Sequence, residues 1–217
     1  STEEAIILTK AAKTIGADAA LLVSPYYNKP PQEGLLQHHL KIAEEVQIPQ
    51  ILYNVPSRTA SFIESSTVSK LAKHENIIGI KDATGEMKNL EDLKSLCNKE
   101  IDAEEFFLFS GDDFTFLEFL QLGGHGTISV TSNVLPSTIS KICDLAKTNL
   151  LEAQTLESSL SELNELLFSE SNPIPVKWAL YKMGLIDNGI RLPLVELNEK
   201  YKKPLETCLN SLGLIDG

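Results

Sequence analysis

Residues 50–81 read QILYNVPSRTASFIESSTVSKLAKHENIIGIK and contain two short apolar runs separated by a helix-length segment. The runs Gln50–Val55 and Ile77–Lys81 are apolar on both faces, which is typical of buried parallel strands. Pro56 ends the first run, and Ser66–Lys73 carries a helical pattern before the second. The stretch therefore predicts a βαβ unit.

The same alternation continues on both sides of this unit. Further apolar runs lie at Ala19–Ser24, Phe106–Ser110 and Gly126–Thr131. Ser1 and Glu4 have the spacing of a capping box, which predicts a helix at the start of the chain. Other helices are predicted at residues 36–46, 89–97 and 115–122. Together these segments predict a βα series with five strands.

Polar side chains stand at or just beyond the C-terminal end of each predicted strand. They are Tyr26, Tyr53, Lys81, Asp112 and Asn133. The active site of a β/α barrel lies at this end of its strands. An open flavodoxin-like sheet places its ligands at the same end, so the pattern alone leaves both folds open.

From about Leu135 the pattern becomes wholly helical, with one long stripe from Ala153 to Leu167. We therefore predict a partial β/α barrel over residues 1–134, with a closing helix and a C-terminal helical appendage over residues 135–217. A complete (β/α)8 TIM barrel needs eight strands, so we expect the first three or so βα units, about 80 residues, upstream of Ser1.

Composition excludes several classes of function. The net charge of −11 opposes binding to a phosphate backbone, so no nucleic-acid partner is expected. No apolar run approaches the roughly 18 residues of a membrane span, and no signal peptide is visible. Cys97, Cys143 and Cys208 are isolated and odd in number, which suits a reducing cytoplasm.

Lys81 is the leading candidate for chemistry. A lysine against apolar walls loses solvation, which lowers its pKa and favours the neutral amine that attacks a carbonyl. Tyr53, at the end of the preceding strand, would lie beside it and could move protons. Arg58 follows in a loop stiffened by Pro56, where a guanidinium suits a substrate carboxylate. Taken alone, Lys81 is more often a solvated loop lysine, and Tyr53 and Arg58 are equally compatible with a purely structural role.

A metal site has weaker support. Asp112, Asp113 and His125 include two carboxylates and one imidazole, but no second histidine stands at ligand spacing. His38 and His39 fit the surface of a helix. We therefore expect no metal and no cofactor.

Several motifs together resemble the dihydrodipicolinate synthase family of the pyruvate-dependent class I aldolases. They are YNVPSR at 53–58, GIKDATG at 79–85, SGDD at 110–113 and NPIPVK at 172–177. The resemblance runs through the chain in order to RLP at 191–193. It implies a lyase that condenses pyruvate with aspartate semialdehyde, through a Schiff base on Lys81, to give 4-hydroxy-tetrahydrodipicolinate for lysine and diaminopimelate biosynthesis.

The resemblance also assigns roles to other residues. Tyr53 would relay protons, and Arg58 would hold the semialdehyde carboxylate. Tyr27 would complete the relay of a neighbouring subunit across a dimer interface. Gly111 and the carbonyl of Ile128 match positions that line the family's pyruvate pocket. Tyr26 and Glu4 match contacts of its lysine-inhibitor site. The family implies a homotetramer built from two dimers. Its relay threonines have no counterpart in this sequence.

Two other readings remain. A sister aldolase acting on N-acetylneuraminate or a keto-deoxy sugar acid would share the lysine and the tyrosine, but generally lacks an arginine at the position of Arg58. A truncated, inactive paralogue would bind a keto acid or a partner without turnover. A metal hydrolase on a barrel is a distant third.

Overall fold

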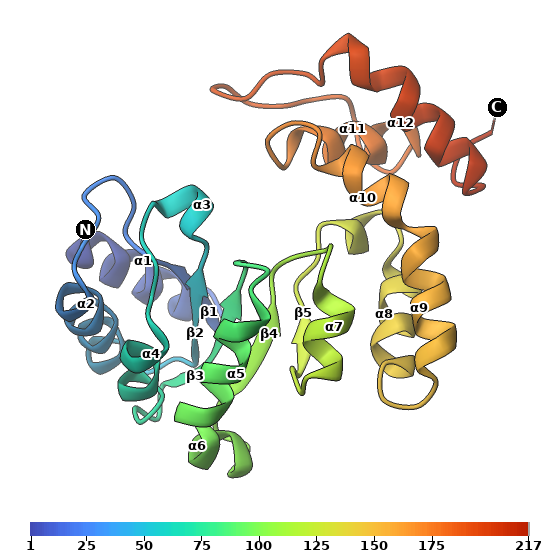
Figure 1. The fold of residues 1–217 in the computed structure, drawn as a ribbon. Coiled ribbons are helices and arrows are strands. Elements are labelled where there is room, and N and C mark those ends of the chain that lie inside the picture. The colour runs from blue at the N-terminus through green and yellow to red at the C-terminus, as the bar shows by residue number, and fades with distance from the viewer. Residues whose placement is uncertain (217) are drawn as a thin grey trace. The chain divides into compact units, whose positions relative to one another are not determined.

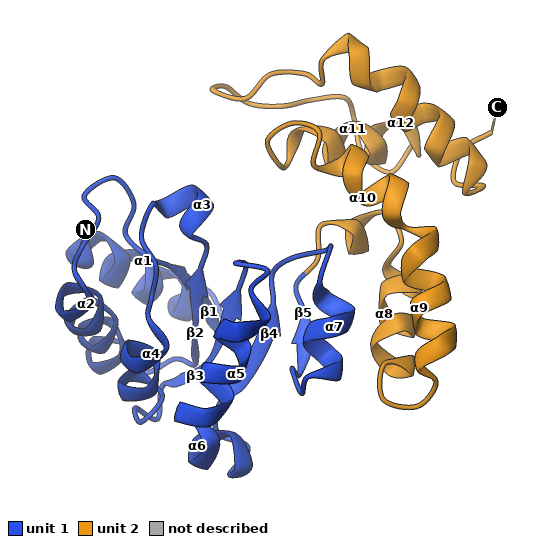
Figure 2. Ribbon diagram, in the orientation of Figure 1, with its two compact units in different colours: residues 1–128 blue, residues 129–217 orange. Residues whose placement is uncertain are grey.

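The computed structural model describes residues 1–216. The chain divides into two compact units, residues 1–128 and residues 129–217 (Figure 1, Figure 2). The division of domains after residue 134 stays a prediction, because compactness alone does not define a domain.

The first unit is built on one parallel sheet, and its five strands confirm the predicted series. They are β1 (Ala20–Val23), β2 (Gln50–Asn54), β3 (Ile77–Asp82), β4 (Phe107–Ser110) and β5 (Gly126–Thr127). The order in the sheet is β1-β2-β3-β4-β5, so each strand pairs with the next in sequence. A doubly wound sheet reverses its order at a switch point, whereas a β/α barrel does not. The strand order therefore favours the barrel.

Helices connect these strands as the sequence predicts. They are α1 (Thr2–Thr14), α2 (Gln32–Glu45), α3 (Pro56–Thr59), α4 (Ser65–Leu71), α5 (Met87–Leu96), α6 (Asn98–Asp102) and α7 (Phe116–Gln121). The Ser1 hydroxyl accepts from the Glu4 amide at 3.2 Å, so the predicted N-cap of α1 is confirmed. The short helices α3 and α6 were not predicted, because four or five residues are too few to show a helical period.

One face of the sheet packs against the helices. Leu52 of β2, Ile80 of β3 and Leu108 of β4 are fully buried there. They belong to one apolar cluster that also contains Leu71 of α4 and Leu90 of α5. Because side chains alternate along a strand, Tyr53 and Lys81 point to the opposite face. We call these the helix face and the inner face.

The fifth strand is shorter than predicted. Pairing stops at Thr127, although the apolar pattern continues to Thr131. The Ser132 amide donates to the Ser129 hydroxyl, and the Ser132 hydroxyl donates to the Ser129 carbonyl, both at 2.8 Å. These local bonds compete with a sheet ladder and favour the 3-10 turn η1 (Thr131–Asn133).

The predicted surface position of His38 and His39 on α2 is wrong. Their exposed fractions are 8% and 0%. Burial lowers the pKa of His39 to about 3, with the neighbouring His38 contributing. Apolar residues at Leu35 and Ile42 flank the pair along α2 and are equally buried. The two histidines therefore belong to the buried side of this helix.

The second unit is helical. Its helices are α8 (Pro136–Leu145), α9 (Leu150–Ser159), α10 (Ser161–Leu167), α11 (Ile174–Lys182) and α12 (Glu199–Ser211). The stripe from Ala153 to Leu167 is divided at Leu160 between α9 and α10. The hydroxyls of Ser159 and Ser161 donate to carbonyls three residues earlier, which weakens a continuous helix there. Throughout residues 1–216, every helix is too short or too polar to cross a membrane.

Candidate active site

Tyr53 and Lys81 lie side by side on the inner face. Residues 53 and 81 are register partners on the neighbouring strands β2 and β3. The Lys81 Nζ atom lies 4.3 Å from the centroid of the Tyr53 ring. Both side chains stand at the C-terminal ends of their strands, where a β/α barrel carries its active site. The structure therefore brings together the two residues that the sequence nominated for Schiff-base chemistry.

The surroundings of Lys81 lower its pKa. Partial burial lowers the pKa of its ammonium group, because the charged form is poorly solvated. The negative charge of Asp113 opposes this shift, and the positive charge of Arg58 adds to it. A lower pKa increases the fraction of neutral amine at physiological pH, and the neutral amine is the nucleophile.

The pKa of Tyr53 shifts in the opposite direction. Burial raises the pKa of its phenol, and the positive charge of Arg58 partly offsets that rise. The phenol therefore keeps its proton and can donate it to an oxygen near Lys81. Arg58 itself is exposed on α3, and its charge acts on both residues. A guanidinium at this rim can attract an anionic substrate.

Gly111 lies directly against the Lys81 side chain. A Cβ atom added at Gly111 would meet Lys81 Cε at 2.7 Å, Ala83 Cβ at 2.9 Å and Lys81 Cγ at 3.1 Å. Distances below 3.0 Å require one of these groups to move. The Gly111 amide donates to the Asp82 carbonyl at 2.7 Å, which holds the glycine beside the end of β3. Gly111 therefore leaves the space that the lysine side chain occupies.

Ile128 continues the strand ends around the site. Its amide donates to the Ser110 carbonyl at 2.9 Å, just beyond the last pair of β4 and β5.

Asp112 binds Thr115, whose hydroxyl donates to the carboxylate at 2.8 Å. Asp113 is buried, and its negative charge raises the pKa of Lys81. In residues 1–216, no group of three or more histidine, cysteine or acidic side chains could hold a metal ion.

Tyr26, Tyr27 and Glu4 lie outside this cluster. Tyr26 and Tyr27 follow β1 and have exposed fractions of 70% and 91%. A ring that is this exposed lies in solvent and does not pack against Lys81. Glu4 is exposed in the first turn of α1. Within one chain, the structure therefore does not join these three residues to the Lys81 site.

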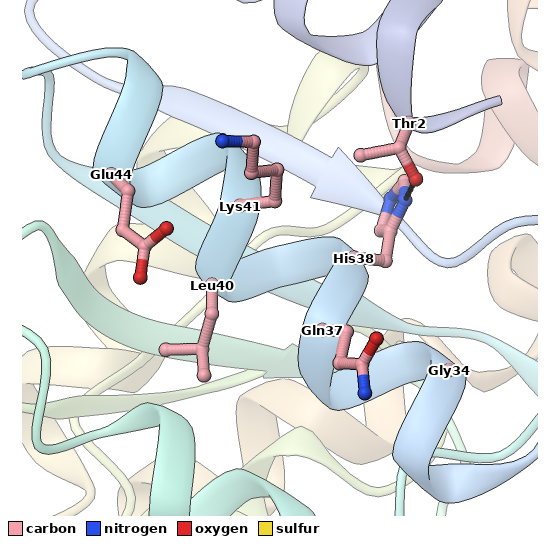
Figure 3. A pocket seen from close by; sticks show the side chains of 7 residues that line it. All are labelled: Thr2, Gly34, Gln37, His38, Leu40, Lys41 and Glu44. Carbon is pink, nitrogen blue, oxygen red and sulfur yellow. Dashed lines mark hydrogen bonds between the residues drawn. The ribbon is translucent and has the colours of Figure 1, made fainter.

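A separate hollow of about 490 Å³ lies beside α2. Figure 3 shows its lining, with the side chains of Thr2 and His38 pointing toward each other. Thr2 Oγ1 and His38 Nδ1 form a hydrogen bond of 2.9 Å. The lining residues are Thr2, Gly34, Gln37, His38, Leu40, Lys41 and Glu44. None of the residues assigned to Schiff-base chemistry belongs to this set, so the hollow is distinct from the candidate active site.

Two residues at the site were missed by sequence reasoning. Asn54 follows Tyr53, Asp82 follows Lys81, and both are buried on the helix face. The Asn54 Nδ2 group donates to Asp82 Oδ1 at 3.1 Å. A polar residue within an otherwise apolar buried strand was the available signal, since such a residue needs a partner.

Fold and site together define a β/α-barrel enzyme with a partly buried lysine beside a tyrosine at the ends of its strands. The chain belongs to the Dihydrodipicolinate synthetase family, whose model matches residues 1–212. It is 51% identical over 216 residues to a 4-hydroxy-tetrahydrodipicolinate synthase of Teredinibacter turnerae, covering 99% of this chain and 72% of the relative. The predicted family and barrel fold are thereby confirmed.

Solved structures show the same likeness. A chloride-inhibited dihydrodipicolinate synthase of Acinetobacter baumannii, complexed with pyruvate, matches with a TM-score of 0.93 and 52% identity. The match covers 99% of this chain and 72% of that one. The enzyme of Cyanidioschyzon merolae with lysine bound matches with a TM-score of 0.93 and 36% identity, again covering 99% and 72%.

Proposed function

We propose that this chain condenses pyruvate with aspartate semialdehyde to give 4-hydroxy-tetrahydrodipicolinate, a step toward diaminopimelate and lysine. The observation that carries the proposal is the Lys81–Tyr53 pair. Lys81 Nζ lies 4.3 Å from the centroid of the Tyr53 ring, and partial burial lowers the pKa of Lys81. The names of the relatives, at about half identity over nearly the whole chain, support the same reaction.

The reaction begins at the Lys81 amine. The neutral Nζ attacks the keto carbon of pyruvate, and the keto oxygen takes up protons and leaves as water. The resulting imine loses a proton from its methyl carbon and becomes an enamine. Tyr53 carries protons in these steps, because burial raises the pKa of its phenol and its ring centroid lies 4.3 Å from Nζ.

The enamine carbon then attacks the aldehyde carbon of the semialdehyde. The amino group of the semialdehyde closes the ring by attacking the imine carbon, which releases Lys81 as a free amine. Arg58 holds the semialdehyde carboxylate through charge-assisted hydrogen bonds. Gly111 and the carbonyl of Ile128 line the pyruvate site. Overall, one water leaves and every other atom is retained in the product.

The experiment is reductive trapping. Incubation with pyruvate and borohydride should reduce the imine to a stable secondary amine, and peptide mass spectrometry should place the label on Lys81. Lys81→Ala should abolish labelling, whereas Lys94→Ala, a change at an exposed lysine with no assigned part in the reaction, should not. A label on another lysine, or none in the unmodified protein, would overturn the proposal.

We further propose a homotetramer made of two dimers, with Tyr27 completing the proton relay of the neighbouring subunit. Tyr27 has a left-handed backbone with φ 71° and a ring that is 91% exposed. This conformation costs a non-glycine residue roughly 1–2 kcal/mol, which suggests a function that requires it. Tyr26 and Glu4 are the proposed contacts for a lysine inhibitor. The three unpaired cysteines suit a cytoplasmic location.

A further inference from the structure

A buried polar cluster lies directly behind the reactive pair. Asn54 and Asp82 are register partners, one residue beyond Tyr53 and Lys81 on the same two strands. Alternation sends their side chains to the helix face, where their exposed fractions are 0% and 4%. The bond from Asn54 Nδ2 to Asp82 Oδ1 therefore joins β2 and β3 at the position next to the chemistry.

The cluster extends to the surrounding helices and loops. Asp82 Oδ2 accepts from Thr84 Oγ1 at 2.8 Å and from Asn89 Nδ2, on α5, at 2.9 Å. The Ser65 hydroxyl, on α4, donates to Asn89 Oδ1 at 2.8 Å. Asp82 thus accepts from three side chains, and Asn89 uses both ends of its amide. The end of β3 is connected to two helices as well as to β2.

The orientation of Asn54 is fixed within this cluster. The Ile63 amide donates to Asn54 Oδ1 at 3.1 Å, and a backbone N–H can only donate. The oxygen of Asn54 must therefore face Ile63, and its NH₂ group must face Asp82. A buried polar cluster with these bonds satisfied defines one arrangement, because any displacement leaves a desolvated group unpaired.

We infer that Asn54 and Asp82 are positioning residues for the reaction, which hold Tyr53 and Lys81 in register through the hydrogen bond behind them. This inference rests on the proposed function of the Tyr53–Lys81 pair. The backbone supports it, since the Ala83 amide donates to the Asn54 carbonyl at 2.9 Å and so continues the ladder past both residues. A displacement of about 1 Å between reacting groups can cost about 100-fold in rate.

A reciprocal exchange tests the inference. Asn54→Asp alone brings two carboxylates together, and Asp82→Asn alone opposes two NH₂ groups. The double variant keeps every bond of the cluster with one direction reversed. The new carboxylate at position 54 accepts from the Ile63 amide and from the new amide at position 82. The oxygen of that new amide accepts from Thr84 and Asn89.

The measurement is the rate of imine formation with pyruvate, by borohydride trapping, on protein shown by circular dichroism to be folded. Each single exchange should lower the maximal rate at least about tenfold and leave the half-saturating pyruvate concentration within about threefold. The double variant should recover to within about threefold of the unmodified protein. Ile80→Val is the matched control, because it shortens a buried apolar side chain of the helix face and removes no hydrogen bond of the cluster. Its rate should be unchanged.

The outcomes separate the two proposals. Wild-type trapping rates in both folded single variants, or no recovery in the double variant, would overturn the positioning role while labelling of Lys81 still supports the proposed function. Absence of labelling in the unmodified protein would overturn the proposed function itself. If a single exchange does not fold, Thr84→Val replaces it, because this change removes one donor to Asp82. A lowered maximal rate would support the positioning role, and an unchanged rate would overturn it.

Discussion

Two adjacent rows of side chains cross the same strands and differ in their exposure to solvent. Val23, Tyr53, Lys81 and Phe109 are register partners across β1 to β4 on the inner face. Their side chains are partly exposed. The next row, Asn54, Asp82 and Ser110, lies on the helix face and is buried.

The difference separates reactivity from position. Lys81 needs partial burial to lose its proton and partial access to meet a substrate, so it can have few fixed partners. Asp82 accepts hydrogen bonds from three side chains and is withdrawn from solvent. One strand thus carries the proposed nucleophile and the proposed positioning residue at consecutive positions, because alternation sends them to different environments. Substitutions on the two faces should therefore affect different measurements.

The largest effect on stability is expected at the helix face. Ile80→Ala removes a fully buried side chain between Gly79 and Lys81. Loss of apolar contacts and the resulting cavity should lower the free energy of unfolding by about 2–5 kcal/mol. Urea unfolding checks this value. The imine rate per folded molecule should stay unchanged at low temperature, and a parallel loss of rate would mean that the two faces are not separable.

Gly111→Ala is the corresponding change on the inner face. The added methyl group would lie 2.7 Å from Lys81 Cε, so the lysine must leave its position. We expect imine formation to slow by about 100-fold, with a smaller change in the urea midpoint than for Ile80→Ala. Trapping kinetics and unfolding are measured on the same preparation. An unaltered trapping rate would show that the lysine does not depend on this space.

Arg58→Ala should separate the two substrates on the inner face. Pyruvate trapping should reach its normal maximum, whereas the catalytic efficiency with the semialdehyde should fall about 10- to 100-fold, through loss of a charged hydrogen-bond donor. A coupled assay of product formation measures the second quantity. Arg58→Lys keeps the charge without the planar fork and should lie between the two. Loss of trapping at its maximum would contradict the assigned role.

The smallest effect is expected in the pH dependence of trapping. Arg58→Ala removes a positive charge that lowers the pKa of Lys81, so its profile should move to higher pH. Asp113→Asn removes a negative charge that raises this pKa, so its profile should move to lower pH. Each profile is normalised to its own plateau. Displacements in the same direction would show that neither charge acts on the amine as described.

Much of the fold and of the site follows from local sequence. The five apolar runs and the intervening helical patterns predicted the strands and helices, because periodicity reports which faces are buried. Lys81, Tyr53, Arg58 and Gly111 were found from their positions at strand ends and from family motifs. Local patterns could not decide between a barrel and a doubly wound sheet. The sequential strand order favours the barrel, and the likeness to solved structures confirms it.

By itself, the sequence determined the order of elements and the choice of Lys81 as the candidate nucleophile, since both depend on nearby residues. The tertiary structure decided which residues meet. It paired Asn54 with Asp82, placed Gly111 against the lysine, and buried His39. Strand register and packing between distant segments set these contacts, because the partners are far apart in the chain and carry no local signal for each other.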